Sequence, residues 1–503
     1  MVDKGQAVKG LSDIQVRQIA QIKRFYEWLQ ADSGLRNRLG ENKELTSTQK
    51  EWLKKIGIDL DINEISFLWK HPAEVNTYII IVTKGLEEHL QNGLKEIISR
   101  YPLLELWGEF IKLRSNTTAV LIDQWTSAES GNKKFNAWRS RRIASAKSEL
   151  GFFGTHTGHP VFSFELNEGC SIGCWFCSFA SSKLSATLDY PQRRGEVISI
   201  IRQCNEIFDR SMVMMALPYY RTEPHDNPHY IDFLKDFEKE TGGVICTSTA
   251  VSGDIEWVND LINYYQKRED GNFFAWPRLS ILSLPALRKI HAAFTPMELF
   301  SVELLIQVRD HERPKVSGGR ILKEQAGLRE LDDFDSLERD PVSLTTLVPQ
   351  GTIACVSGFN INLTNRTIMA LSPCYTSEKW PYGFRVFGEA AYNDESDFSE
   401  IIIDLVERCM FLTPPRDNVL KFRDDIVFHP TDEGFDLATP NQRHHFKGKS
   451  KCGPLGQLIA EGRYTYAQVT EILLTRYMIN PIILRAVVQQ LFDEGFIDEI
   501  YEN

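Results

Sequence analysis

Several features common in other protein classes are scarce or missing in this sequence. No apolar run reaches about 18 residues, so we expect no membrane-spanning helix and no membrane partner. The first residues, Met1–Gln6, lack the apolar core of a signal peptide, which favours a cytoplasmic location. Basic residues number 57 against 68 acidic ones, and the net charge of −11 argues against a general nucleic-acid-binding protein. Cysteine is sparse, with nine in 503 residues, which argues against a disulfide scaffold.

Three of the cysteines are nevertheless clustered. Cys170, Cys174 and Cys177 follow the spacing Cys-x3-Cys-x2-Cys, and Phe176 directly precedes the third. Three thiolates are one short of the set that a [4Fe–4S] cluster takes, which would leave one iron open to a small molecule. A structural zinc site would normally show four Cys or His ligands in paired spacings, and the upstream residues His156 and His159 do not complete such a set.

The spacing and the aromatic residue resemble the signature of the radical S-adenosylmethionine (radical SAM) enzymes. The resemblance implies a [4Fe–4S] cluster on the three cysteines, with the open iron chelating S-adenosyl-L-methionine (SAM). It also implies that Phe176 belongs to the cofactor-binding site.

Strands and helices alternate from about residue 160 to 310, which predicts a parallel α/β sheet. The radical SAM resemblance implies a partial (β/α)6 barrel, with the cysteine loop at the carboxyl end of its first strand, where barrel active sites lie. Helices are expected over 193–208 and 230–240, and residues 317–341 as a loop. The expected strands are 161–166, 212–217, 244–249, 279–284 and 302–308, with 352–357 as the sixth.

A second motif follows the second expected strand. Arg221-Thr222-Glu223-Pro224 resembles the Gly-Gly-Glu-Pro motif of radical SAM enzymes, although both glycines are replaced. The resemblance implies that Glu223 binds the SAM ammonium group, and a carboxylate suits that charge. An ordinary loop glutamate is the alternative. Further SAM contacts are expected at other strand ends, from Thr249, Ser283 and Arg309.

Residues 355–361 and 368–374 alternate like a hairpin that turns at 364–366. This hairpin resembles the one that opens the auxiliary-cluster extension of peptide-modifying radical SAM enzymes. Only Cys409 and Cys452 lie downstream of it, fewer than a second cluster would need, so we expect no second cluster. A small buried hydrophobe is the plainest interpretation of the cysteine that ends the hairpin, Cys374.

The pattern predicts four regions along the chain. They are a helical N-terminal region over 1–150, the partial barrel over 151–345, a hairpin and bridging helix over 346–415, and a winged-helix-like domain over 416–503. The first region includes Lys133–Lys147, a basic helix that could be a solvated face or a site for an acidic peptide.

The last region shows strand-like pieces at 426–428 and 435–437 before three helices. It ends in acidic residues and carries only Arg485 on its third helix, which argues against a DNA reader. It resembles the recognition element of enzymes that mature ribosomally made, post-translationally modified peptides (RiPPs). Such domains bind a leader peptide as an added strand. A generic helical cap is the alternative.

Together these features resemble the radical SAM peptide epimerases of proteusin-type RiPP maturation. The resemblance implies that a 5′-deoxyadenosyl radical removes the α-hydrogen of an L-residue and that a cysteine thiol returns hydrogen from the opposite face, giving a D-residue. Cys374 matches the family's donor position, and Cys355 is the second choice. The remaining cysteines, Cys204, Cys246 and Cys409, are expected to be structural. The implied partners are a ribosomal precursor peptide, its leader bound by the C-terminal domain, and a one-electron reductant such as a flavodoxin or ferredoxin.

Two alternatives remain open. A radical SAM peptide cyclase or thioether cross-linking enzyme would share the cluster and the leader-binding domain, but would normally need auxiliary clusters. A protein of another class, a non-catalytic leader-peptide-binding protein or regulator with a degenerate barrel, would not need the intact cysteine triad.

Overall fold

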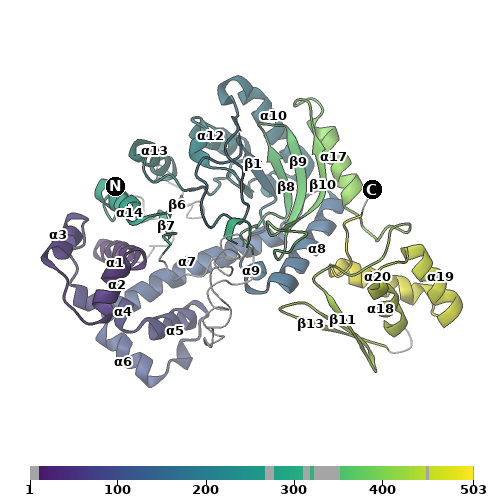
Figure 1. Cartoon of the computed structure of the whole chain (residues 1–503), viewed down its shortest axis with the longest axis horizontal. Helices are drawn as coiled ribbons and strands as arrows, with labels where there is room; N and C mark the ends of the chain where they lie inside the picture. Colours follow the sequence, from purple (N-terminus) through teal and green to yellow (C-terminus); the bar gives the residue numbers. More distant parts are fainter. Residues whose placement is uncertain (1–10, 267–276, 310–317, 322–351, 449–451, 502–503) are drawn as a thin grey trace, which may run out of the picture. The chain divides into compact units, whose positions relative to one another are not determined.

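The computed structural model describes residues 11–266, 277–309, 318–321, 352–448 and 452–501. The fold is mixed α/β (Figure 1) and divides into two compact units. Unit 1 comprises residues 1–121, 223–234 and 244–313, and unit 2 comprises residues 122–222, 235–243 and 314–503. Within the described ranges, none of the helices has both the length and the apolar character of a membrane span.

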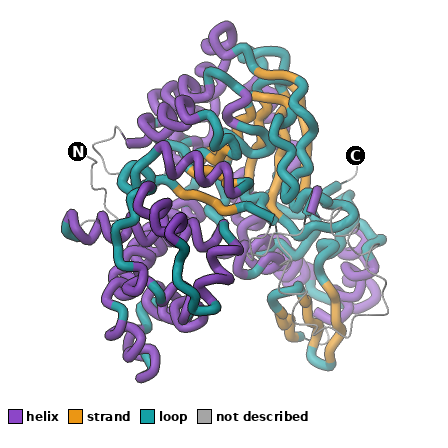
Figure 2. Tube along the Cα trace, turned by 60° about the vertical axis from the view of Figure 1, so that its left-hand side comes forward, coloured by secondary structure: helices purple, strands orange, loops and turns teal. Residues whose placement is uncertain are grey.

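The N-terminal part of unit 1 is helical, as the purple tube in Figure 2 shows. Its first helix begins where Ser12 and Gln15 form a reciprocal capping box, and it buries Ile19, Phe25 and Trp28 in the unit 1 core. The last helix of this part continues into unit 2. The elements are α1 (Asp13–Ala31), α2 (Ser33–Gly40), α3 (Ser47–Lys55), η2 (Ile62–Ile65), α4 (Phe67–Lys70), α5 (Pro72–Thr83), η3 (Glu87–His89), α6 (Asn92–Arg100) and α7 (Pro102–Ser127).

Unit 1 also contains a parallel sheet of three strands in the order β5-β6-β7. Because the strands are parallel, their carboxyl ends lie at the same edge. The strands are β5 (Ser248–Thr249), β6 (Arg278–Ile281) and β7 (Glu303–Ile306), and the neighbouring helices are η4 (Pro224–Asp226), α12 (Tyr230–Thr241), α13 (Ile255–Gln266) and α14 (Leu284–Ala293). Helix α12 passes into unit 2 after residue 234.

Unit 2 is built on a five-stranded sheet in the order β10-β9-β8-β1-β4. Strand β1 is parallel to both β4 and β8, and β8, β9 and β10 form an antiparallel meander. Figure 1 shows these last three strands beside α17. The strands are β1 (Phe162–Glu165), β4 (Ala216–Leu217), β8 (Gly358–Asn362), β9 (Thr367–Pro373) and β10 (Phe384–Ala391).

Aromatic side chains fill one face of this sheet. Phe162 on β1 and Phe359 on β8 stack at 5.7 Å between ring centroids, and Phe208 lies 5.4 Å from the first and 5.2 Å from the second. The helices and short elements of this part are α8 (Lys133–Leu150), α9 (Phe152–Thr155), α10 (Tyr190–Phe208), α11 (Arg210–Val213) and α17 (Phe398–Cys409), with the two-residue strands β2 (Asn167–Glu168) and β3 (Ala186–Thr187).

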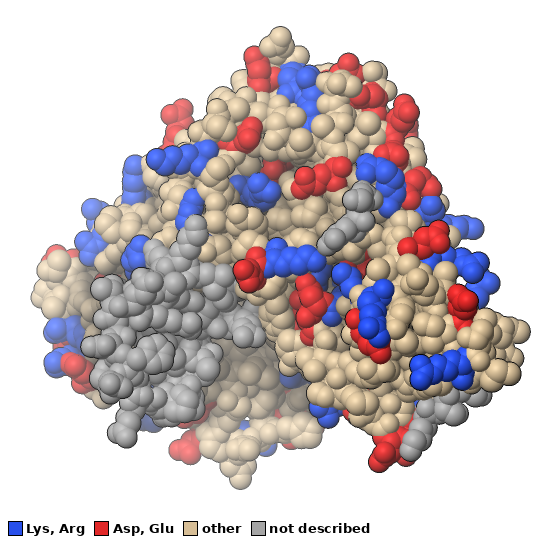
Figure 3. Space-filling view, turned by 45° about the vertical axis from the view of Figure 1, so that its right-hand side comes forward, with Lys and Arg blue, Asp and Glu red and all other residues tan. Residues whose placement is uncertain are grey.

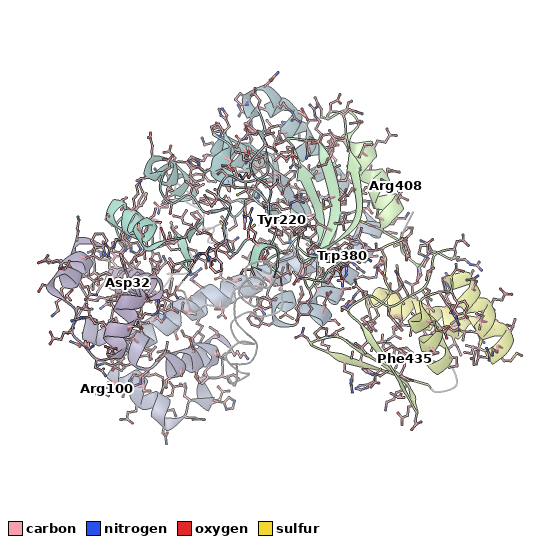
Figure 4. All side chains as sticks on the ribbon, in the orientation of Figure 1. Asp32, Arg100, Tyr220, Trp380, Arg408 and Phe435 are labelled. Carbon is pink, nitrogen blue, oxygen red and sulfur yellow. The ribbon has the colours of Figure 1, made fainter. Side chains whose placement is uncertain are left out.

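The C-terminal part of unit 2 has an antiparallel sheet in the order β11-β12-β13, followed by three helices. Phe435 of the central strand, labelled in Figure 4, is fully buried and stacks on Phe446 at 4.9 Å. The elements are β11 (Val427–Thr431), β12 (Gly434–Ala438), β13 (Arg443–Lys447), α18 (Cys452–Glu461), α19 (Tyr466–Tyr477) and α20 (Pro481–Asp493).

Several expected strands are shorter than predicted. Of 212–217 only Ala216–Leu217 is strand, because Asp209 caps the short helix α11. Of 244–249 only Ser248–Thr249 is strand, and 279–284 ends early because Ser283 caps α14. Most of the expected loop 317–341 lies outside the described residues.

The expected sixth strand is wrong. Residues 352–357 are irregular, and the strand that follows them, β8, pairs with β1 and with the hairpin strand β9. The described strands therefore form two separate parallel groups, and no closed barrel is seen among them.

The basic helix predicted over Lys133–Lys147 is α8. For its central arginines, the predictions of a solvated face and of a site for an acidic peptide are both wrong. Arg139, Arg141 and Arg142 are at most 2% exposed, so they face neither solvent nor a peptide. Arg141 and Arg142 both pair with Glu499 near the end of the chain. The acidic C-terminal segment thus supplies the partner of the basic helix. The paired residues are 358 positions apart for Arg141 and Glu499, a contact that local patterning does not reveal.

Candidate functional site

The three clustered cysteines lie on a loop that leaves the carboxyl end of β1. The loop is closed at its base by the short antiparallel pair of β2 and β3, and the Cys170 N–H donates to the Ser182 carbonyl at 3.0 Å. Gly169 has a φ of 82°, and a Cβ there would collide with the Lys183 carbonyl, so this closure requires glycine. The three cysteines are partly exposed and none is in a disulfide.

Residues 318–321 brace this loop from outside. The Arg320 guanidinium donates to the Cys174 carbonyl at 3.2 Å, and the Arg320 backbone N–H donates to the Cys177 carbonyl at 3.0 Å. Gly319 has a φ of 53° and approaches the Ser178 carbonyl too closely for a side chain. The backbone carbonyls of the cysteine loop are therefore held by a distant segment, which the motif alone could not predict.

The cysteine thiols of this loop are the type of ligand that a [4Fe–4S] cluster takes. Within the described residues, no three His, Cys, Asp or Glu side chains are gathered closely enough to hold one metal ion. In a cubane cluster each thiolate binds a different iron, so the sulfurs stand farther apart than the ligands of a single ion. Three partly exposed cysteines on one braced loop fit that donor set, and Cys170, Cys174 and Cys177 would be the ligands.

Glu223 and Thr249, both predicted to contact SAM, are brought together in unit 1. One Glu223 carboxylate oxygen accepts from the Thr249 hydroxyl, and the other accepts from the Ala250 N–H at 2.9 Å. Glu223 is only 3% exposed, and its burial raises the pKa of the carboxyl group, although the two donors oppose this. The carboxylate thus sits at the carboxyl end of β5 among hydrogen-bond donors.

The other two predicted SAM contacts lie at the same edge of the β5-β6-β7 sheet. Ser283 follows β6 and is exposed, and its hydroxyl accepts from the Ala286 N–H at 3.3 Å as the N-cap of α14. Arg309 follows β7 and is exposed. Sequence reasoning missed His225, whose Nε2 lies 3.1 Å from the Asp254 carboxylate and whose ring packs on Trp257 at 5.0 Å. Its place two residues after Glu223 was the only available signal.

The predicted hairpin is present as β8 and β9, and it carries both candidate donor cysteines at one end. The last ladder pair is Gly358 opposite Leu371, and Cys355 and Cys374 each lie three residues beyond it. Cys374 is fully buried, whereas Cys355 is partly exposed. Burial raises the pKa of the Cys374 thiol, which keeps it in the S–H form.

The segment that follows Cys374 meets the braced cysteine loop. We define residues 374–383, between β9 and β10, as the Cys374 loop. It is closed by a hydrogen bond from the Cys374 N–H to the Gly383 carbonyl at 3.0 Å. Residue Gly319, next to the cysteine-loop brace Arg320, donates its N–H to the Pro381 carbonyl at 3.0 Å. The cluster motif and the candidate donor, 200 residues apart in the sequence, are therefore linked through residues 319 and 320.

Tyr220 lies between these two loops and was missed by sequence reasoning. Its ring packs 4.7 Å from Phe179, just after the cysteine motif, and 6.1 Å from Phe384, which pairs with Pro373 beside Cys374. Its buried hydroxyl has no hydrogen-bond partner among the residues that the structure describes. Figure 4 labels Tyr220 and Trp380 of the Cys374 loop.

Charge is mixed over the face seen in Figure 3, where Lys and Arg are interspersed with Asp and Glu. Exposed basic residues do occur on β13, where Arg443, His445 and Lys447 alternate with more buried side chains. This strand is an edge of its sheet.

The chain is similar to a known protein. Over 494 residues the chain is 29% identical to "Uncharacterized protein y4wI" of Sinorhizobium fredii (strain NBRC 101917 / NGR234), an alignment that covers 96% of this chain and 88% of the relative. No family model matches the chain. No solved structure matches it either. The relative's name indicates no activity.

Proposed function

We propose that this protein is a radical SAM epimerase that converts L-residues of a ribosomal precursor peptide to D-residues. The observation that carries the proposal is the Cys-x3-Cys-x2-Cys loop at the carboxyl end of β1. The parallel strands β1, β4 and β8 and the parallel strands β5, β6 and β7 supply the kind of strands that a partial radical SAM barrel needs.

The chain would supply the ligands and the polar contacts of the cofactors. Cys170, Cys174 and Cys177 would hold the [4Fe–4S] cluster, and Glu223 would accept hydrogen bonds from the SAM ammonium group. Thr249 would orient the Glu223 carboxylate, to which its hydroxyl already donates. When bound and reduced, the cluster and SAM supply a 5′-deoxyadenosyl radical, and the protein contributes geometry and exclusion of water.

Hydrogen return requires a neutral thiol. In the proposed reaction the α-carbon of the peptide would lose a hydrogen atom to the 5′-deoxyadenosyl radical. The S–H bond of a cysteine would then break as a new C–H bond forms on the opposite face. A one-electron reductant and a proton restore the resulting thiyl group. The raised pKa of Cys374 supports this role, because the S–H form is the donor, unlike the thiolate that a nucleophile needs.

The C-terminal domain would hold the leader peptide. Strand addition needs an exposed sheet edge, and β13 offers one. The other edge strand, β11, contains Pro430, which lacks an N–H to donate to an added strand.

Iron counting and SAM cleavage test the cluster assignment. Anaerobically reconstituted protein should bind about four irons per chain and cleave SAM to 5′-deoxyadenosine when reduced. Cys174→Ala should lose both, whereas Cys409→Ala, on α17 and outside the loop, should keep both. Bound zinc with no SAM cleavage in the native chain would contradict the proposal.

A further inference from the structure

The Cys374 loop is held by the C-terminal domain as well as by the cysteine-loop brace. The Trp380 indole N–H donates to the Asp424 carboxylate at 3.1 Å, and Asp424 also accepts from Arg385 of β10 at 2.8 Å. Arg385 also donates to the Asp425 carboxylate at 3.1 Å. That carboxylate accepts two further hydrogen bonds from the Arg423 guanidinium, each at 2.9 Å. One end of the loop is thus fixed by residues that directly precede β11.

The residue after Cys374 is fixed by Glu149, at the end of α8. The Tyr375 N–H donates to Glu149 Oε1 at 2.8 Å, and Arg385 donates to both Glu149 carboxylate oxygens. Glu149 is 1% exposed and Arg385 is 4% exposed. A buried carboxylate in such a network must keep its partners, since each lost hydrogen bond leaves a desolvated group.

The turn between the last two strands of the C-terminal sheet adds a further contact between this network and the domain. Asn441, in the turn between β12 and β13, donates through Nδ2 to the Glu149 carbonyl at 2.6 Å and to the Tyr375 hydroxyl at 2.9 Å. Gly151 has a φ of 54° and makes room for the Asn441 side chain, because a Cβ there would meet it at 2.6 Å. The turn that leads directly into the exposed edge strand is therefore bonded both to Tyr375, the residue that follows Cys374, and to Glu149, which accepts from the Tyr375 N–H.

We propose that Asn441 and Glu149 are positioning residues through which the C-terminal domain sets the position and exposure of Cys374. A strand added to β13 would act on the turn that carries Asn441, and through it on the Cys374 loop. An effect of Asn441 on hydrogen return would follow only if the proposed function is correct. An effect of Asn441 on the exposure of the Cys374 thiol is independent of that function, because it depends only on these contacts.

Thiol alkylation in the full chain tests the coupling without any enzyme assay. Asn441→Asp keeps the size of the side chain but removes the amide donor, and Gln442→Glu makes the same charge change at the next, exposed position. Iodoacetamide labelling is followed by peptide mass spectrometry, with Cys204, fully buried in α10, as an internal reference for general loosening. Asn441→Asp should raise the labelling rate of Cys374 relative to Cys204 by about 5–10-fold, the effect of losing one or two hydrogen bonds, and Gln442→Glu should leave it unchanged. Tyr375→Phe should act in the same direction with a smaller effect.

An unchanged Cys374 rate in Asn441→Asp would overturn the proposal, as would equal increases at Cys374 and Cys204. In reconstituted protein given precursor peptide, Asn441→Asp should also form more 5′-deoxyadenosine per D-residue than Gln442→Glu does. If the native chain forms no D-residues, the epimerase assignment fails, while the labelling ratio still decides whether Asn441 positions Cys374.

Discussion

At the scale of single residues, Glu223 is the clearest candidate ligand outside the cysteine loop. Its carboxylate is buried and accepts from donors at one strand end, Thr249 and Ala250. An ammonium group would find an acceptor that these donors already orient. Hydrogen bonds to charged groups contribute about 1.5–3 kcal/mol, so their loss changes affinity by about ten- to a hundredfold.

Glu223→Gln should therefore weaken SAM binding by at least about tenfold. Equilibrium binding of SAM to the reconstituted protein measures this, with Glu256→Gln, an exposed acidic residue in the first turn of α13, as the matched control. Equal affinity in the two variants would show that Glu223 is an ordinary loop residue.

A buried histidine, His159, makes stability depend on pH. Its ring lies between the Ser357 hydroxyl at 2.8 Å and the Gly154 carbonyl at 3.1 Å, and burial lowers its pKa to about 4 from an ordinary value of 6.5. Between these two values the unfolded chain binds more protons than the folded one. The free energy of unfolding should therefore fall as the pH is lowered from about 6.5 to about 4, by about 2–3 kcal/mol for this group.

Denaturant unfolding at a series of pH values checks this prediction. His159→Gln should make the free energy of unfolding depend less steeply on pH over that range. Some dependence should remain from His291 in unit 1, because burial lowers its pKa to about 4 as well. A variant with the same slope as the native chain would contradict it.

At the scale of elements, α8 connects the unit 2 sheet with the C-terminal domain. Trp138 packs on Phe387 of β10 at 5.2 Å, and Arg141 bonds Glu499 at 2.6 Å while lying 4.0 Å from the Phe492 ring. Glu499 is the shared partner of two buried arginines. Removing its charge leaves both without their carboxylate.

Glu499→Gln should destabilise unit 2 by about 3–5 kcal/mol, the cost of breaking a buried ion pair from one side. Asp493→Asn, an exposed acidic residue at the end of α20, should change stability by less than about 0.5 kcal/mol. Chemical denaturation of the two variants compares them directly, and similar midpoints would refute the structural role of Glu499.

Local patterns predicted some of these elements and not others. Helical spacing located α10 and α12, and strand alternation located the β8–β9 hairpin and its turn. The irregular residues 352–357 look like a strand because Ala354 and Val356 are buried, but their side chains fill the core beside Tyr220. Periodicity indicates which side chains are buried, but not whether the backbone pairs with a neighbouring strand.

The candidate site shows the same limit. The cysteine motif and Glu223 are short local signatures, so the sequence was enough to single them out. Arg320, Glu149 and Asn441 act through contacts that join segments more than 100 positions apart, and no local pattern marks them.

At the scale of the whole molecule, the alignment with the Sinorhizobium fredii protein covers nearly the full chain, including the N-terminal helices and the C-terminal domain. In unit 2 the cysteine loop, the Cys374 loop and the C-terminal sheet form one connected series of hydrogen bonds. This series is what an enzyme would need if leader binding and hydrogen return were coupled.

In the proposed reaction, hydrogen returns to a peptide α-carbon from a protein thiol. The most direct measurement is a reaction in heavy water, run anaerobically with reconstituted protein, SAM, reductant and a precursor peptide encoded beside it. We expect D-residues that carry deuterium at the α-carbon, because a thiol exchanges with solvent. We also expect that Cys374→Ala still cleaves SAM but forms no D-residues. Peptide that loses hydrogen without gaining deuterium, or unchanged D-residue formation in Cys374→Ala, would contradict it.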